Sequence, residues 1–269
     1  MSKKKKEELL PLGHPIFETH CHLDYLKRFA LDDLLEKCQQ VGVEKIMTIG
    51  VSPEHQNIIV DIANHYPHIY CSQGIHPHDA SKYSAEIEQI ILNNIQNSKV
   101  LAIGEIGLDY HYDYSPREIQ QQVFQRQLEI ALEHKMPIII HTREADEDTL
   151  KILKSIEGHT SRIVLHSYTS GAELVDYAIS QNYFIGFNGI ITFKNAHNVR
   201  EILHRVPIEH LVVETDAPFL APTPHRGIEN GPQLLPFIIQ VIAQEKNISV
   251  YELMPILWKN SHLLFNLEL

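Results

Sequence analysis

The chain has 269 residues, of which 43% are hydrophobic and 21% are charged, as in an ordinary globular protein. This length suits a single α/β barrel, which commonly takes about 250 residues. The 23 basic and 34 acidic residues give a net charge of −11, which excludes a broad basic surface that would hold nucleic acid by counterion release alone. We therefore expect any contact with nucleic acid to be local.

The N-terminal segment contains a short basic run, Lys3 to Lys6, but no apolar stretch of the kind found in signal peptides. We expect residues 1–15 to form a disordered tail, with a phosphate-binding or targeting role for the basic run as the alternative. No apolar run approaches the roughly 20 residues that span a bilayer. We expect a cytoplasmic protein without membrane contact; its oligomeric state stays open, with a monomer among the possibilities.

The cysteines indicate neither a disulfide framework nor a thiolate zinc site. Cys21, Cys38 and Cys71 are odd in number and show no paired spacing. A reducing compartment agrees with this pattern.

Eight segments along the chain are predicted to be strands. Each is rich in apolar residues and is bounded by polar, Gly or Pro residues. Some are continuously apolar, as parallel strands that are covered on both faces should be. In chain order they are Ile16–His22, Lys45–Val51, Ile69–Ile75, Val100–Leu108, Pro137–Thr142, Arg162–Ser167, Tyr183–Asn188 and Leu211–Thr215.

Helical segments lie between the predicted strands. The clearest is Pro116–Lys135, where Pro116 takes the first helical position and the spacing of Ser115 and Glu118 predicts a capping box. Eight strands that alternate with helices predict a (β/α)8 TIM barrel formed by residues 16–269 as one domain. A doubly wound open sheet is the structural alternative.

Acidic residues and histidines recur where the predicted strands end, which is the end of a barrel where active sites are built. Taken singly, each is more often a hydrogen-bonded interior or rim residue. Buried imidazoles and carboxylates are costly unless they are paired or metal-bound, so a convergent set of at least four histidines with two carboxylates at one end indicates divalent cations. The residues at these positions are His20, His22, His76, Glu105, His141, His166 and Asp216.

Glu105 lies in the run A-I-G-E-I-G-L-D, where Gly104 and Gly107 permit close approach of backbone or ligand. Its two carboxylate oxygens could bridge two metals. The alternative is a structural ion pair with Arg143 or Arg226. Both arginines could instead form forked hydrogen bonds to a phosphate, or be solvated loop charges.

Six motifs occur in order between about residue 16 and residue 266. They are E-T-H-C-H-L-D (Glu18–Asp24), G-I-H-P-H (Gly74–His78), G-E-I-G-L-D (Gly104–Asp109), H-T-R-E-A (His141–Ala145), L-H-S-Y (Leu165–Tyr168) and E-T-D-A-P-F-L-A-P (Glu214–Pro222). With these motifs the chain resembles the TatD family of metal-dependent deoxyribonucleases. The resemblance implies an amidohydrolase-type barrel, two divalent metal ions (Mg²⁺, Mn²⁺ or Zn²⁺), and cleavage of DNA, often from the 3′ end.

The resemblance also implies a role for each site residue. It places His76, Arg143 and Arg226 near the substrate phosphate. We expect Glu105 to bridge the metals and Asp216 to be the general base. The metal-binding positions are His20, His22, Glu105, His141, His166 and Asp216.

Two positions depart from the family pattern: Glu18 stands where Asp is usual, and Ile228 stands where a loop Lys is common. The second departure bears on phosphate affinity or substrate preference.

Two other functions stay open. The same site could hydrolyse an amide, lactone or ester, or the protein could be a metal-containing scaffold without turnover.

Overall fold

The computed structural model describes residues 9–159 and 162–269, and it confirms all eight predicted strands to within three residues at each end. The apolar runs form strands that are buried on both faces, as parallel strands require. The strands are β1 (Ile16–Cys21), β2 (Val43–Thr48), β3 (Ile69–Gln73), β4 (Val100–Asp109), β5 (Ile138–Arg143), β6 (Ile163–Leu165), β7 (Phe184–Phe187) and β8 (Leu211–Val213).

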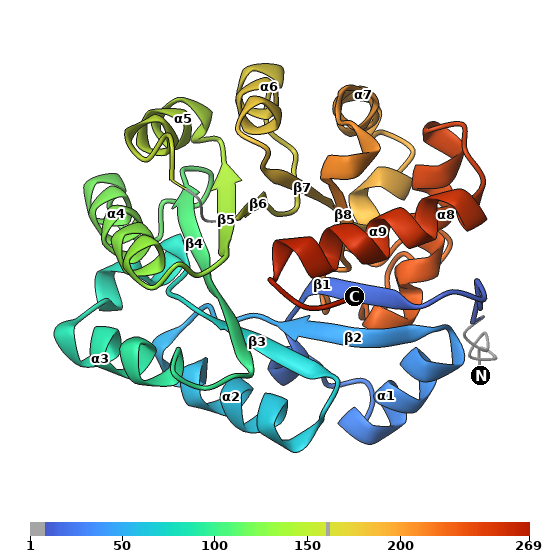
Figure 1. Ribbon diagram of the computed structural model, residues 1–269, viewed down its shortest axis with the longest axis horizontal. Coiled ribbons are helices and arrows are strands. Elements are labelled where there is room, and N and C mark those ends of the chain that lie inside the picture. The colour runs from blue at the N-terminus through green and yellow to red at the C-terminus, as the bar shows by residue number, and fades with distance from the viewer. Residues whose placement is uncertain (1–8, 160–161) are drawn as a thin grey trace.

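The strands form one parallel sheet in the order β1 to β8, and the sheet closes on itself (Figure 1). Just beyond β8, the Asp216 N–H donates to the carbonyl of His20 at 2.9 Å, and the His22 N–H donates to the carbonyl of Ala217 at 2.7 Å. These bonds bring the last strand back to the first. The fold is therefore a (β/α)8 barrel, and the open-sheet alternative is wrong.

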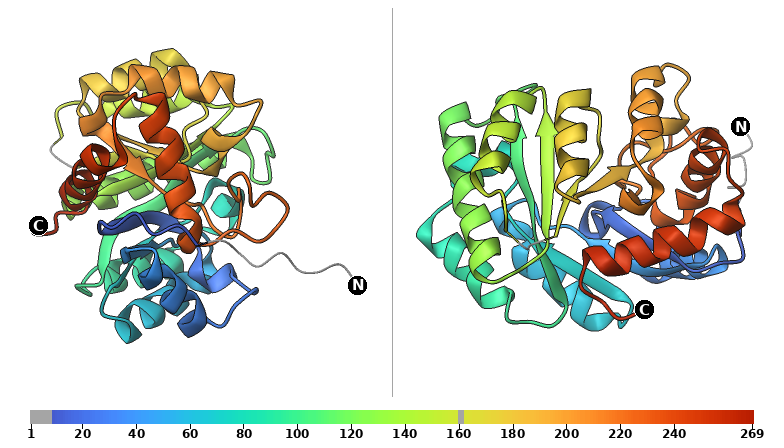
Figure 2. Two further views of the ribbon diagram at one scale, coloured as in Figure 1. Left: turned by 90° about the vertical axis from the view of Figure 1, so that its right-hand side faces the viewer. Right: turned by 45° about the horizontal axis from the view of Figure 1, so that its top comes forward.

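Helices surround the barrel, and two of them follow β8 (Figures 1 and 2). Each of the first seven connects one strand to the next. The helices are α1 (Leu31–Gln40), α2 (Gln56–His65), α3 (Ala85–Asn94), α4 (Arg117–Glu133), α5 (Asp146–Ser155), α6 (Ala172–Ser180), α7 (His197–Arg205), α8 (Leu235–Glu245) and α9 (Val250–Leu264).

The start of α4 differs from the prediction in one respect: Ser115 does not form a capping box. The helix begins at Arg117, and no side chain caps its first turn. Ser115 Oγ instead donates to the carbonyl of His78 and accepts the N–H of Ser81, both at 3.0 Å. The buried hydroxyl thus joins two loops at the carboxyl end of the barrel.

The core has two layers. The larger lies between the strands and the helices. The smaller fills the barrel, where Leu264, the last residue of α9, and Phe265, directly after it, pack among residues near the strand starts. Helix α9 therefore closes the barrel at the end opposite to the polar cluster. The inward-facing residues are Phe17, Met47, Ala102, Ile139, Val164, Phe184 and Val212.

The remaining predictions about the chain are met in part. Residues 1–8 of the predicted tail lie outside the described residues. Residues 9–15 have no helix or strand, but Leu9 and Leu12 pack against the core, so the packed chain begins earlier than expected. The three cysteines are buried free thiols. Across residues 9–159 and 162–269, no helix is both long and apolar enough to cross a membrane.

Candidate metal centre

The structure gathers all seven polar residues from the strand ends into one cluster. Each comes from a different strand end except His20 and His22, which share β1 and the residue after it. Neighbouring parallel strands end at one rim of the barrel, so residues far apart in the chain meet there. The cluster consists of His20, His22, His76, Glu105, His141, His166 and Asp216.

Glu105 is the centre of this cluster, and its two oxygens face different histidines. Oε2 lies 3.3 Å from His20 Nε2. Oε1 lies 2.9 Å from His141 Nδ1 and 2.8 Å from His166 Nε2, with His76 Nε2 at 3.4 Å. Imidazole nitrogens thus lie against both oxygens of this carboxylate, so either oxygen could share a cation with them.

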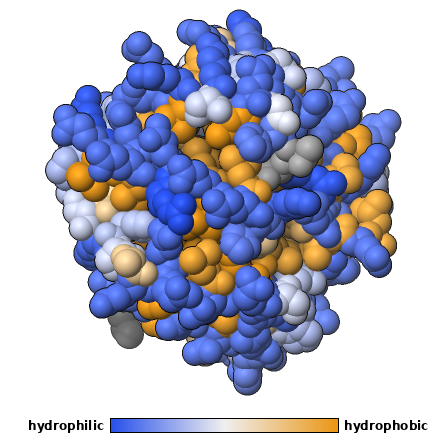
Figure 3. Space-filling model, turned by 60° about the vertical axis from the view of Figure 1, so that its left-hand side comes forward, coloured by the Kyte–Doolittle hydropathy of each residue, from blue (hydrophilic) through white to orange (hydrophobic). Residues whose placement is uncertain are grey.

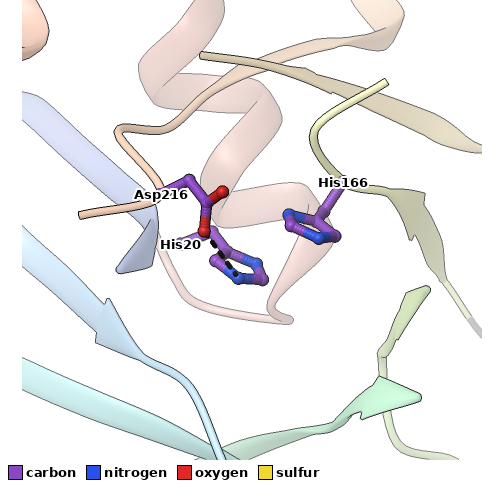
Figure 4. A group of neighbouring side chains, drawn as sticks. All are labelled: His20, His166 and Asp216. Carbon is purple, nitrogen blue, oxygen red and sulfur yellow. Dashed lines mark ion pairs between the residues drawn. The ribbon is translucent and has the colours of Figure 1, made fainter. Parts of the chain in front are cut away.

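Asp216 completes the cluster on the β1 side. Its Oδ1 lies 3.5 Å from His22 Nε2 and 3.9 Å from His20 Nε2. The ring of His20 stacks on that of His166, with centroids 3.8 Å apart (Figure 4). Asp216 has a φ of 56°, in the left-handed region that Asp and Asn tolerate better than most residues.

Several buried imidazole nitrogens have no hydrogen-bond partner among residues 9–159 and 162–269, which fits a metal-binding role. They are Nδ1 and Nε2 of His20, Nδ1 of His22 and Nδ1 of His166. Because buried polar atoms are usually satisfied, bare nitrogens beside carboxylates suit divalent cations. In the described part of the chain, three overlapping groups of residues each have ligand atoms within 4.8 Å of one another. They are His20, His166 and Asp216; His20, His22 and Glu105; and His76, Glu105 and His141.

The electrostatics keep both carboxylates ionised. Burial would raise the pKa of Glu105, but nearby His166 and His76, with others, outweigh it and hold that pKa well below its ordinary value. Burial would likewise raise the pKa of Asp216, yet its hydrogen bond with His22 and the adjacent imidazoles lower it. Ionised carboxylates are the form that binds cations.

The pKa values of the histidines shift in different directions because their surroundings differ. Burial lowers the pKa of His76 to about 4, and burial together with His166 lowers that of His20. Burial also opposes charge on His166, but Glu105 and Glu214 overcome it and raise that pKa well above its usual value. A cluster that draws protons onto some of its imidazoles would exchange those protons for a cation.

Asp109, the last residue of β4, supports the cluster and was missed in the sequence. Its Oδ2 lies 3.1 Å from His141 Nε2 and 3.0 Å from His78 Nε2, and its Oδ1 accepts the N–H of His111 and of Tyr112. A carboxylate on the second nitrogen of a metal-binding histidine fixes its tautomer and orientation. Its place in the motif G-E-I-G-L-D was the available signal.

Two more buried acids brace the site from outside. Glu214 Oε1 accepts the Ser167 N–H at 2.5 Å and lies 3.4 Å from His166 Nδ1. Glu18 accepts the N–H of His20 and of Thr215, which ties β1 to β8, and burial raises its pKa to about 8. The larger Glu at position 18 is thus a brace between strands rather than part of the cluster.

Close packing of β4 on β5 sets the distance between Glu105 and His141. Gly107 has a φ of 142°, and a Cβ there would lie 1.9 Å from the carbonyl oxygen of His141. Only glycine fits, as the sequence predicted.

Buried glutamines on α4 position the loops that carry site residues. Gln120 accepts the Asp109 N–H at 2.8 Å and donates to the carbonyls of Asp109 and Ser115. Gln127 accepts the Ile75 N–H at 2.7 Å and donates to the carbonyl of the same residue, directly before His76. Each amide satisfies backbone groups where a strand ends.

The structure does not bring Arg143 or Arg226 to Glu105. In the described part of the chain, the ion-pair partners of Glu105 are histidines, so the ion-pair alternative is wrong. The Arg143 guanidinium lies over the ring of Tyr112 at 4.9 Å, and that of Arg226 lies over Phe193 at 3.6 Å. Their contact with phosphate stays a prediction.

Comparison with known proteins identifies the family. The family model described as TatD related DNase matches residues 17–266. The chain belongs to the TatD family. The uncharacterized metal-dependent hydrolase YabD of Bacillus subtilis is 35% identical over 254 residues, 94% of this chain and 100% of YabD. The TatD of Escherichia fergusonii, named a 3′-5′ ssDNA/RNA exonuclease, is 34% identical over 79% of this chain and 84% of its own length.

A solved TatD structure has the same fold. The crystal structure of YjjV, a TatD homolog from Escherichia coli, superposes with a TM-score of 0.88 at 28% identity and covers 94% of this chain and 98% of that one. The protein is therefore a metal-dependent hydrolase of the TatD family, and the resemblance seen in its motifs is confirmed.

Proposed function

We propose that the protein hydrolyses phosphodiester bonds of DNA from the 3′ end, with two divalent cations held by the cluster. The single observation that carries the proposal is the arrangement of Glu105 between histidines on both sides. One cation would be held by His20, His22, Glu105 and Asp216, and the other by Glu105, His141 and His166. Bound there, the cations would supply Lewis acidity toward water and toward the phosphate oxygens.

The chain's own groups would perform the remaining tasks. Asp216 is ionised and partly open to solvent, so it can accept the proton of the attacking water. His76 is held neutral at the edge of the cluster and can orient the phosphate. Arg143, at the end of β5, supplies a forked donor for a phosphate oxygen.

Two hollows elsewhere on the described surface differ in the charge of their lining. One of about 400 Å³ lies between α4 and α5, lined by apolar residues such as Leu128 and flanked by Glu129 and Glu133. Figure 3 shows one face of the molecule, on which patches of hydrophobic side chains lie among hydrophilic ones. A second, of about 710 Å³, is lined by two arginines, Arg143 and Arg205, together with three carboxylates. With a net charge of −11, DNA would contact few cationic groups, and the salt dependence of binding should be shallow.

The test begins with protein stripped by a chelator and reloaded with Mg²⁺, Mn²⁺ or Zn²⁺. Its substrate is single-stranded DNA labelled at the 5′ end, and mass spectrometry counts the bound metal. We expect hydrolysis only in the reloaded protein, with a product ladder that shortens from the 3′ end.

Asp216→Asn should keep the metal and lose about 10²- to 10⁴-fold in kcat, because Asn cannot accept the proton but tolerates the same backbone conformation. Asp176→Asn, at an exposed carboxylate, is the matched control. Undiminished hydrolysis in chelator would refute the metal mechanism. Turnover of an ester or lactone without any of DNA would favour the other substrate class.

A further inference from the structure

Two aromatic side chains stand exposed beside the metal centre. Tyr112 is 45% exposed and Tyr114 is 67% exposed. Their rings stack on each other with centroids 5.2 Å apart and planes 17° apart. Large aromatic residues usually bury their surface, so two that stack on each other at the surface indicate a binding function.

The loop that carries these tyrosines is held in place from both ends. Asp109, which also lies against His141, accepts the Tyr112 N–H at 3.0 Å. Asp113, between the tyrosines, accepts two bonds from the Arg117 guanidinium at 2.8 and 2.9 Å. The platform is thus pre-formed, and one carboxylate joins it directly to the metal cluster.

Ring contacts lead from the platform to Glu105. The His78 ring packs edge-on against Tyr114 at 4.8 Å and against Tyr112 at 5.4 Å. His78 in turn lies 4.3 Å from the ring of His76, whose Nε2 lies 3.4 Å from Glu105 Oε1. The tyrosines therefore stand two ring contacts from the cluster, within reach of a nucleotide next to the one whose phosphate is cleaved.

We infer that Tyr112 and Tyr114 form a stacking platform for the bases of a single-stranded nucleic acid whose phosphate occupies the metal centre. The inference rests on the proposed phosphodiesterase function. Arg143, over the ring of Tyr112, provides a cation beside the platform for the backbone. Every base has a flat π face, so stacking recognises a strand without reading its sequence. The bases of a duplex are already stacked on each other, and the platform therefore selects an unpaired strand.

The experiment compares two substrates of equal length and charge, a fluorescent oligothymidylate and an oligomer in which tetrahydrofuran residues replace every nucleoside. The full-length protein is reloaded with metal, and dissociation constants are measured by anisotropy in addition to kcat/KM. For the double variant Tyr112→Ala, Tyr114→Ala we expect affinity for oligothymidylate to fall about tenfold or more. Affinity for the abasic oligomer should not change, because it has nothing to stack.

The double variant Tyr112→Phe, Tyr114→Phe should bind as the parent does, because phenylalanine keeps the aromatic face. Tyr251→Ala, at a tyrosine that is 70% exposed on α9, is the matched control. Equal losses on both substrates, or no loss on oligothymidylate, would overturn the platform. Because binding is read separately from turnover, a protein that binds through these tyrosines but cleaves neither oligomer would refute the proposed hydrolysis alone.

Discussion

Asp109 shows how one buried carboxylate can organise a site that it does not enter. One oxygen lies against two imidazoles and the other accepts two backbone N–H groups of the following loop. These contacts hold its pKa well below the ordinary value although burial opposes ionisation. The anion therefore fixes both the orientation of His141 and the path of the chain beyond β4.

Replacing Asp109 by Asn should weaken metal binding about 10- to 100-fold, because the amide no longer provides a charged partner for His141. Competition with a chelating dye measures this affinity. Asp113→Asn changes an exposed carboxylate of the same loop and should bind metal as the parent does. Unchanged affinity in Asp109→Asn would mean that His141 is oriented by other contacts.

The sequence was sufficient to predict the residues of the cluster, but not the buried acids that hold them in place. His20, Glu105 and Asp216 could be predicted because polar residues at strand ends stand out against apolar strands. Asp109 and Glu214 occur in the same motifs, but their roles depend on which nitrogen of a histidine faces outward. That information arises only when strands from distant parts of the chain meet.

Helix α4 packs against the barrel and also contacts the loops of the site, and these loop contacts are made by polar side chains rather than apolar ones. The sequence predicted this helix over Pro116–Lys135, and Val123 and Leu128 are buried on the face that packs against the barrel. The same buried face carries Gln120 and Gln127, which a hydrophobic pattern counts as exceptions. The predicted capping box was wrong because the Ser115 hydroxyl bonds instead to the backbone of a different loop. The local spacing of Ser and Glu carries no information about such a tertiary contact.

Gln120→Leu preserves the shape of this side chain but leaves the Asp109 N–H and two carbonyls without their partner. We expect the free energy of unfolding to fall by about 2–4 kcal/mol, since each unsatisfied buried group costs roughly 1–3 kcal/mol. Urea denaturation measures the change. The control is Gln122→Leu, at an exposed position of the same helix, which should unfold like the parent. Equal stability of the two variants would show that water replaces the lost bonds.

The whole molecule places the smaller apolar core, inside the barrel, and the reactive cluster at opposite ends of that barrel. All eight strands could be predicted from apolar runs and from the polar, Gly or Pro residues that bound them, because both reflect local backbone preference. That α9 turns back to close the barrel could not be predicted, because a helix near the end of a chain has no pattern that specifies its docking site.

Phe265→Ala should therefore separate stability from activity. Phe265 is 1% exposed inside the barrel, and its truncation should lower the free energy of unfolding by about 3–5 kcal/mol. Below the unfolding transition, kcat/KM should match that of the parent. Leu263→Ala, at a neighbour that is 39% exposed, should change neither quantity. A large loss of activity at a temperature where Phe265→Ala is folded would contradict the separation of the two ends.

The closure of β8 on β1 also decides when the centre can exist during biosynthesis. Glu18 bonds Thr215 across 197 positions of the chain, and Asp216 follows directly. A ribosome that has translated the first seven strands holds a nascent chain with its histidines but neither Asp216 nor a closed barrel. The metal cluster can therefore assemble only after the last strand has left the exit tunnel, so the order of synthesis makes the centre one of the last parts of the molecule to form.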